Sequence, residues 1–211
     1  MSYRPTYNYI PPIKWHWQTP WYDFFCAASG LGKRFREKVL QAVAIHDGQI
    51  IADVGCGTGV FVEIAKRRYP SAHFIGIDPD RKALAIAEQA LKRAGLAVEL
   101  KHAFAEALPL ASGSVDICFS TLAFHHMPNE IKQKAAQEIY RVLKPDGVVV
   151  IADFGESKSF FLRKMLFFEK MEYLEGNLNG LIPRYLQEAG FKTPETIGTH
   201  FPGIQIVRTK K

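Results

Sequence analysis

IADVGCGTGV (Ile51–Val60) carries the strongest structural signal in this chain of 211 residues. Apolar residues surround one acid, and three glycines then follow at positions 55, 57 and 59. A short, β-branched run of this kind is typical of a strand buried on both faces, and glycines give the turn that follows the freedom to take positive φ. The stretch therefore predicts a buried strand, a tight glycine turn and then a helix.

Strands and helices alternate through the residues that follow. The next predicted strands are 72–78, 97–100, 114–121 and 148–154, and the predicted helices are 58–68, 80–95 and 129–144. We expect Asp80 and Asn129 to cap the second and third of these helices, and residues 145–147 to form a turn. The alternation predicts an α/β fold with a parallel sheet that helices cover on both faces.

The composition, 47% hydrophobic and 23% charged, is that of a globular chain, and the length fits one domain. The sequence holds no apolar run long enough to span a membrane, and the N-terminal residues lack the apolar core of a signal peptide. Cys26, Cys56 and Cys118 have neither disulfide nor metal-ligand spacing, so we expect a cytoplasmic protein without a metal site. The net charge of +6 would suit nucleic acid or an acidic lipid surface, but such a charge also occurs in proteins that bind neither.

The glycine turn is expected at the carboxyl edge of the sheet, where open α/β sheets bind ligands. A phosphate loop would need Lys-Ser or Lys-Thr after these glycines, and a dinucleotide turn would need a glycine in place of Val60. S-adenosylmethionine has no phosphate and needs only a close backbone approach, for which Gly55 and Gly57 leave room. Asp78, at the end of the next predicted strand, is suited to accept both hydroxyls of a ribose. These residues favour S-adenosylmethionine over a nucleotide.

Several segments together resemble the class I S-adenosylmethionine-dependent methyltransferases, in particular the group with the ubiquinone/menaquinone-biosynthesis enzymes and many small-molecule methyltransferases. The segments are DVGCGTG, GIDPD, AEALPLASGSVDICFSTLAFHHM and EIYRVLKPDGVVVIADF, and the resemblance covers about residues 45–155 before continuing more weakly through LIPRYLQEAGF. It implies a Rossmann-like, seven-stranded, mostly parallel sheet whose final strand, expected at Gly203–Arg208, runs antiparallel between its neighbours. The implied function is methyl transfer from S-adenosylmethionine to a small molecule.

The resemblance also implies cofactor-binding roles for individual residues. Asp53 would orient the loop and reach the amino group of the cofactor, Asp78 would hold the ribose, and Pro79 would lie beside the adenine. The remaining expected cofactor-binding residues are Tyr22, Gly55, Cys56, Gly57, Gly59, Ala105, Glu106 and Ser120. Phe104 stands where an acid often accepts from the adenine, so we expect Glu106 to replace that acid or Phe104 to pack near the ring. For Tyr22, ordinary packing in an amphipathic helix is an equally open interpretation.

His125 and His126 follow the fourth predicted strand, where the methyl group should emerge. Either histidine could be a general base, which is needed only if the acceptor loses a proton, and local packing is the alternative role. The chain lacks the motifs of the DNA adenine and cytosine methyltransferases, so we do not expect DNA to be the substrate. We expect a small, hydrophobic acceptor: a quinol, phenol, amine or lipid headgroup.

The expected organisation is a single methyltransferase domain. Residues 1–46 would form an aromatic, helical cap, 47–155 the cofactor-binding core, 156–180 a substrate lid, and 181–211 the last helix and terminal strands. The aromatic residues in the cap and lid suit a hydrophobic acceptor, with contact to a membrane surface as a further option. The sequence leaves two other functions open, a non-catalytic binding subunit and a dinucleotide-dependent oxidoreductase.

Overall fold

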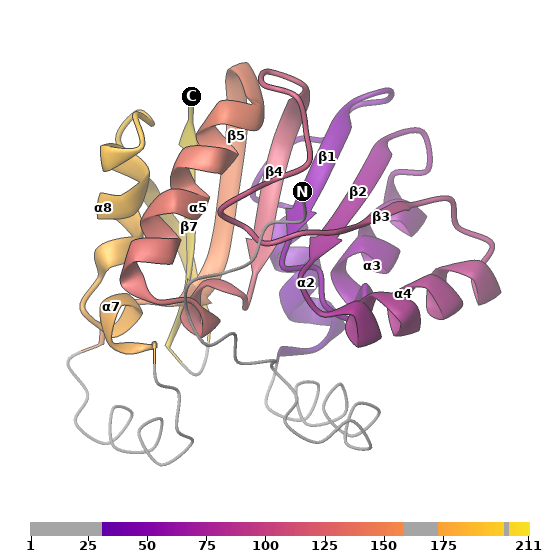
Figure 1. The fold of residues 1–211 in the computed structure, drawn as a ribbon, viewed down its shortest axis with the longest axis horizontal. Coiled ribbons are helices and arrows are strands. Elements are labelled where there is room, and N and C mark those ends of the chain that lie inside the picture. The colour runs from indigo at the N-terminus through magenta and orange to yellow at the C-terminus, as the bar shows by residue number, and fades with distance from the viewer. Residues whose placement is uncertain (1–30, 158–172, 201–202) are drawn as a thin grey trace.

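The computed structural model describes residues 31–157, 173–200 and 203–211, which form one seven-stranded sheet with helices on both faces (Figure 1). The strands are β1 (Ile50–Val54), β2 (His73–Asp78), β3 (Glu99–His102), β4 (Val115–Thr121), β5 (Leu143–Phe154), β6 (Glu195–His200) and β7 (Ile204–Lys210). The helices are α2 (Lys33–Leu40), α3 (Val60–Arg68), α4 (Arg81–Arg93), the short 3-10 helix η3 (Phe124–His126), α5 (Asn129–Val142), α7 (Glu175–Leu178) and α8 (Leu181–Glu188). This architecture confirms the α/β expectation.

The strand order is β3-β2-β1-β4-β5-β7-β6. The pairs that strands β1 to β5 form with one another are all parallel, whereas β7 pairs antiparallel with both β5 and β6. The expected antiparallel strand between two neighbours is therefore confirmed. The order reverses between β1 and β4, and such a reversal opens a crevice at the carboxyl ends of the two strands.

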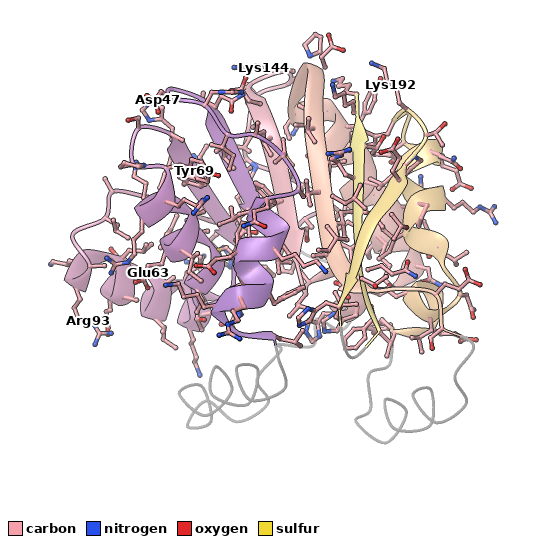
Figure 2. The ribbon with its side chains drawn as sticks, turned by 180° about the vertical axis from the view of Figure 1, so that it is seen from behind. Asp47, Glu63, Tyr69, Arg93, Lys144 and Lys192 are labelled. Atoms are coloured by element: carbon pink, nitrogen blue, oxygen red, sulfur yellow. The ribbon has the colours of Figure 1, made fainter. Side chains whose placement is uncertain are left out.

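The sheet is buried on both faces because its apolar side chains alternate between two clusters. Ile51 and Phe119 pack on one face with residues of α2 and α3, while Ala52 and Cys118 pack on the other with α5 and α8. Helix α2 stands in front of the sheet in Figure 2, which views the molecule from behind. Burial of both faces explains why the strands read as continuous apolar runs in the sequence.

Several expected boundaries and one expected cap were wrong. Helix α3 begins at Val60, after the N-cap residue Gly59, and β3 lies two residues later than expected. Helix α5 has Pro128 at its N-cap, so Asn129 is the first helical residue and its side chain accepts from Lys132 Nζ instead (3.4 Å). Asp80 does cap α4, as expected, through bonds from two N–H groups in the first turn.

Strand β5 begins earlier than expected, at Leu143. Its pairing with β4 shifts register between Leu143 and Val148, and Asp146 within that irregular stretch has a φ of 60°. The expected turn is thus a bulge within the strand.

Within the described ranges, no helix is long and apolar enough to cross a membrane. Tyr22, Cys26 and residues 158–172 of the expected lid lie outside the described residues.

Candidate active site

The glycine turn links β1 to α3 at the carboxyl edge of the sheet. The N–H groups of Gly55 and Cys56 both donate to the carbonyl of Ile77 on β2, at 2.8 and 3.1 Å. Gly55 has a φ of 82°, and a Cβ there would overlap the side chain of Ala123, so packing alone requires glycine. A Cβ on Gly57 would instead meet nothing within 4 Å. The protein leaves free space at this position of the turn.

A cavity opens beside this turn. Most of the predicted cofactor-binding residues line it: Asp53, Gly55, Cys56, Gly57, Asp78, Pro79, Ala105 and Glu106, together with His126. Because these residues come from the ends of β1 and β2 and from the loop after β3, the topology brings together the motifs that the sequence places far apart. No group of three or more His, Cys, Asp or Glu suited to a metal ion occurs in the described part of the chain.

Asp53 is the most perturbed acid of the cavity. The residue is 2% exposed, and its Oδ1 atom has no hydrogen-bond partner. Burial, followed by repulsion from Asp78, raises the pKa of Asp53 to about 8, although Arg36 partly opposes this shift. A buried acceptor without a partner costs free energy, so this carboxyl group is poised to receive a donor from a ligand.

Asp78 is fixed at the end of β2 by backbone donors. Its Oδ2 accepts from the N–H of Gly57 and its Oδ1 from the N–H of Asp80, both at 2.8 Å. Burial raises the pKa of Asp78 to about 6, with these two hydrogen bonds opposing the shift. Each carboxylate oxygen can accept more than one bond, so both remain able to take a hydroxyl donor.

Arg36 and Thr121 also line the cavity, and neither was expected there from the sequence. Arg36 on α2 donates from Nη1 to the carbonyl of Leu31, while its Nε is buried without a partner. The Oγ1 of Thr121, the last residue of β4, is likewise buried and unpartnered. The spacing of Phe35, Val39 and Leu40 fits an amphipathic helix, and this pattern is a signal that could have directed attention to Arg36.

Ser120 does not lie with the other predicted residues. It is fully buried and does not line the cavity, and its hydroxyl donates to the carbonyl of Val54 on β1 at 2.8 Å. Because successive side chains of a strand point to opposite faces, Ser120 points away from the cavity and the next residue, Thr121, faces it. The expectation that Ser120 contacts the cofactor therefore has no support from its position. Gly59 also lies off the cavity wall and serves as the left-handed N-cap of α3.

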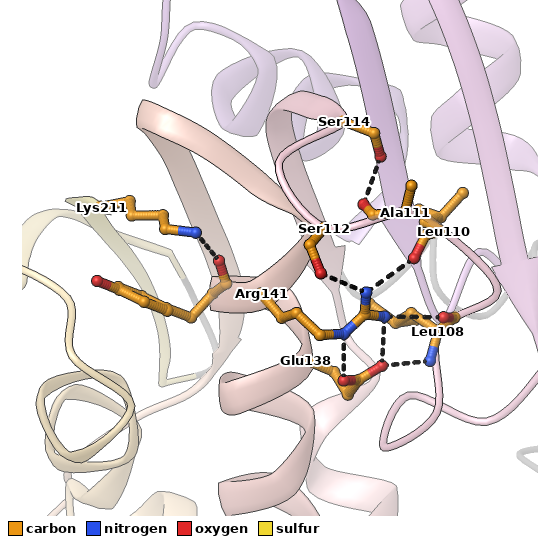
Figure 3. Close-up of polar contacts among 9 residues, drawn as sticks. Leu108, Leu110, Ala111, Ser112, Ser114, Glu138, Arg141 and Lys211 are labelled. Atoms are coloured by element: carbon orange, nitrogen blue, oxygen red, sulfur yellow. Dashed lines mark hydrogen bonds and ion pairs between the residues drawn. The ribbon is translucent and has the colours of Figure 1, made fainter.

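The loop between β3 and β4 forms the wall that carries Phe104, Ala105 and Glu106. Two residues of α5 bind this loop, as Figure 3 shows. Arg141 donates to the carbonyls of Leu108 and Leu110 at 3.0 and 2.9 Å. Glu138 accepts from the N–H of Leu108 at 2.8 Å and pairs with Arg141 through both of its oxygens. We refer to Glu138 and Arg141 as the loop clamp.

The two candidate histidines occupy different environments. His126 lines the cavity, and its Nε2 is buried without a partner. His125 lies behind it, 4% exposed and off the cavity wall, with Nδ1 2.8 Å from the Oδ1 of Asp153. The centroids of the two rings are 4.0 Å apart. The structure thus separates a histidine on the cavity wall from one that is paired with a buried carboxylate.

The chain is similar to known methyltransferases in sequence and in fold. The sequence profile of the family described as "Methyltransferase domain" matches residues 51–147. The demethylmenaquinone methyltransferase of Thermus thermophilus is 31% identical over 175 residues, which cover 80% of this chain and 79% of that protein. The tRNA (carboxymethyluridine(34)-5-O)-methyltransferase of Macaca fascicularis is 31% identical over 64% of this chain, although the match spans only 18% of that larger protein.

Among solved structures, a SAM-dependent methyltransferase from Aquifex aeolicus superposes with a TM-score of 0.64 at 21% identity, covering 83% of this chain and 88% of that one. At this identity the likeness shows a shared fold. The match to the Thermus enzyme covers most of both chains at a higher identity, and the family profile spans the glycine turn and both acids of the cavity. The chain therefore belongs to the class I S-adenosylmethionine-dependent methyltransferases.

Proposed function

We propose that this enzyme binds S-adenosylmethionine in the cavity beside the glycine turn and methylates a small, hydrophobic quinol. The observation that carries the first part is a pair of unsatisfied, buried polar atoms of opposite character, the Oδ1 of Asp53 and the Nε of Arg36, in two residues that line the cavity. An amino-acid tail carries an ammonium group and a carboxylate, which would satisfy these two atoms together.

The other cofactor contacts follow from the same wall. Asp78 would accept from the ribose hydroxyls, because its carboxylate is held at the end of β2 by the N–H groups of Gly57 and Asp80. The free space at Gly57 would let the cofactor approach the backbone of the turn closely. A larger residue at this position would fill that space and exclude the cofactor. The adenine would lie against Pro79 and Phe104, with the N–H of Ala105 as a donor.

When bound, S-adenosylmethionine supplies a methyl group on a positively charged sulfur, which is already activated for transfer. The residues of this chain therefore need only to align the acceptor, exclude water and remove any proton that the acceptor loses. A quinol carries such a proton on its hydroxyl. The name of the Thermus relative, a demethylmenaquinone methyltransferase, supports a quinone-derived acceptor for this chain.

Peripheral membrane contact and the closure of a lid over the acceptor remain expectations, because the aromatic segments that motivate them lie mostly outside the described residues. The small-molecule acceptor itself rests on the relative and on the absence of DNA methyltransferase motifs. The similarity to a tRNA methyltransferase is confined to a small part of that protein and makes RNA a necessary control.

The test is methyl transfer from isotope-labelled S-adenosylmethionine to a panel of acceptors, followed by mass spectrometry. The panel holds a demethylated naphthoquinol, a simple phenol, phosphoethanolamine and unmodified tRNA. We expect label in the naphthoquinol, formed with an equal amount of S-adenosylhomocysteine. Label in tRNA or phosphoethanolamine instead would overturn the acceptor assignment. Binding of the cofactor without methyl transfer to any acceptor of the panel would refute the proposal that the enzyme methylates a quinol.

A further inference from the structure

Two polar atoms of the cavity wall are buried without a partner and have no part in the expected cofactor contacts. They are the Oγ1 of Thr121 and the Nε2 of His126. Burial of a polar atom without a hydrogen bond costs free energy, so folded proteins seldom leave such atoms in place without a reason. A second ligand in this part of the cavity would supply the missing hydrogen bonds.

Both residues lie on the β4 side of the cavity. Thr121 is the last residue of β4, and His126 is the last residue of η3, the short helix that follows. The expected contacts to the ribose and the adenine come from the end of β2 and from the loop after β3. In the sheet, β2 and β4 flank β1 on opposite sides. The glycine turn after β1 therefore lies between the ribose contacts and the two unpartnered atoms.

An unusual backbone conformation directs the chain from β4 into η3. Leu122, directly after Thr121, has a φ of 56°, which is uncommon for a residue with a side chain. Its N–H donates to the carbonyl of Ala152 on β5 at 2.8 Å, so pairing with the next strand holds this conformation. Within η3, the N–H of His126 donates to the carbonyl of Ala123 at 3.1 Å. The fold thus maintains a costly conformation at the point that brings Thr121 and His126 to one cavity.

The ring of His126 is supported from behind. Its centroid lies 4.0 Å from that of His125, and the Nδ1 of His125 lies 2.8 Å from the Oδ1 of the buried Asp153. His125 also packs edge-on against Phe154, with centroids 5.1 Å apart. These contacts fix His125 behind the wall and leave His126 as the histidine that reaches the cavity.

The two unpartnered atoms together suit a hydroxyl group. The Thr121 hydroxyl can donate and accept, and the Nε2 of His126 does one or the other according to the tautomer of the ring. A hydroxyl group on a ligand is itself both a donor and a hydrogen-bond acceptor, so it can satisfy both side chains with either tautomer. The neighbouring wall residues Leu122, Ala123 and Met127 are apolar, which suits an uncharged ring better than a charged group.

We propose that Thr121 and His126 bind the hydroxyl group of the methyl acceptor and so select an apolar ring that carries one. This inference rests on the proposed function, since it places the quinol beside the cofactor. The hydroxyl group bonds to both side chains, while the ring contacts Leu122, Ala123 and Met127. A ring without the hydroxyl group would leave two buried polar atoms unpaired, and a site of this kind discriminates strongly against such an analogue.

Binding of two aromatic probes to the protein saturated with S-adenosylhomocysteine tests the inference without methyl transfer. The probes are naphthol and naphthalene, which differ by the hydroxyl group and can both be followed by their fluorescence. We expect the wild type to bind naphthol at least about tenfold more tightly than naphthalene. Equal affinities for the two probes would overturn the inference.

Three variants assign the preference to the two side chains. Thr121→Val keeps the shape of the side chain without its hydroxyl group, His126→Leu removes the ring nitrogens, and His126→Gln retains a polar group. We expect Thr121→Val and His126→Leu each to weaken the binding of naphthol about five- to tenfold and to leave that of naphthalene unchanged. His126→Gln should retain more of the preference than His126→Leu. Wild-type affinity for S-adenosylhomocysteine in all three would show that the variants are folded.

Thr196→Val and His73→Leu are the matched controls, because both residues are exposed and neither lines the cavity. Both controls should bind the two probes as the wild type does. Loss of affinity for S-adenosylhomocysteine in Thr121→Val or His126→Leu would assign these atoms to the cofactor and overturn the inference. An equal loss of affinity for both probes would overturn it as well, since the side chains would then contribute only shape.

Turnover on the naphthoquinol separates this inference from the proposed function. Thr121→Val and His126→Leu should each raise KM about five- to tenfold. An unchanged KM in both variants would overturn the inference and leave the proposed function intact. A wild type that methylates no acceptor of the panel would refute the proposed function, and the probe titrations would then decide alone whether the cavity recognises a hydroxyl group.

Discussion

Replacing Arg141 with methionine should loosen the loop that forms one wall of the cavity. The guanidinium donates to the carbonyls of Leu108 and Leu110 and to the hydroxyl of Ser112, at 3.0, 2.9 and 3.2 Å. It also fixes the Glu138 carboxylate that accepts from the N–H of Leu108. Methionine retains much of the apolar stem but none of these donors, so the change isolates the polar part of the loop clamp.

The magnitude follows from these contacts. Three hydrogen bonds to the loop at about 0.5–1 kcal/mol each give a loss of about 1.5–3 kcal/mol in the free energy of unfolding. The lower half of that range is the more appropriate, because the Arg141 side chain is 35% exposed and solvent screens its charge. The loop carries Phe104 to Glu106 on the cavity wall, so a loosened loop should also weaken the affinity for S-adenosylhomocysteine. Each 1.4 kcal/mol that is lost from the free energy of binding lowers this affinity about tenfold.

Urea unfolding measures the loss of stability, and calorimetric titration with S-adenosylhomocysteine measures the loss of affinity. Hydrogen exchange of residues 103–114 measures how far the loop is loosened. Arg184→Met is the matched control, since Arg184 on α8 pairs with Glu188 at 2.6 Å on an exposed surface, where such pairs contribute little. If Arg141→Met bound S-adenosylhomocysteine with wild-type affinity and its loop exchanged no faster than in the control, the clamp would have no part in forming the cavity.

Three further predictions concern single positions. The folded state holds a proton on Asp53 up to a pKa of about 8, whereas the unfolded chain releases it near 4, so the wild-type free energy of unfolding should fall between pH 6 and pH 8. Asp53→Asn should show less of this fall in urea unfolding at the two pH values, and an equal fall would contradict the assignment. Gly59→Ala should cost about 1–3 kcal/mol, because Gly59 has a φ of 81° and the new Cβ would lie 2.8 Å from that of Ala87; an unchanged melting temperature would refute this. Lys211→Met should cost about 1 kcal/mol, because Nζ donates to the carbonyl of Tyr140 at 2.6 Å and lies 4.4 Å from its ring centroid (Figure 3 shows the lysine); thermal unfolding checks it.

Much of the cavity could be predicted because its residues sit at fixed places in a repeating local pattern. Asp53 is the last residue but one of a buried strand and Asp78 ends the next, so the parallel topology alone requires both acids to reach the same edge of the sheet. The glycines between them could be assigned to a turn from their spacing. These are short-range relations, and sequence expresses them directly.

The remaining features depend on long-range packing that local patterns do not contain. Arg36 reaches the cavity from a helix that precedes the first strand, and its role requires knowledge of how α2 lies on the sheet. Asp153 and His125 are 28 residues apart and meet only because β5 pairs with β4 in one register. The wrong expectation for Asn129 has a similar cause, since its side chain is engaged by Lys132 and does not cap the helix. Ser120 was expected at the cofactor, but the cavity is lined by the next residue, Thr121, because neighbouring side chains in a strand point to opposite faces.

The central claim, that S-adenosylmethionine binds against the glycine turn, is tested most directly by calorimetric titration of two matched variants with S-adenosylhomocysteine. Gly57→Val and Gly95→Val both place a branched side chain at a positive φ, 53° and 66°, and in both cases the protein leaves the new Cβ free of contacts within 4 Å. Only Gly57 lines the cavity. We predict that Gly57→Val weakens binding by at least about 10²-fold, a loss of about 2.7 kcal/mol, whereas Gly95→Val binds as the wild type does. Wild-type affinity in a folded Gly57→Val variant would contradict the claim.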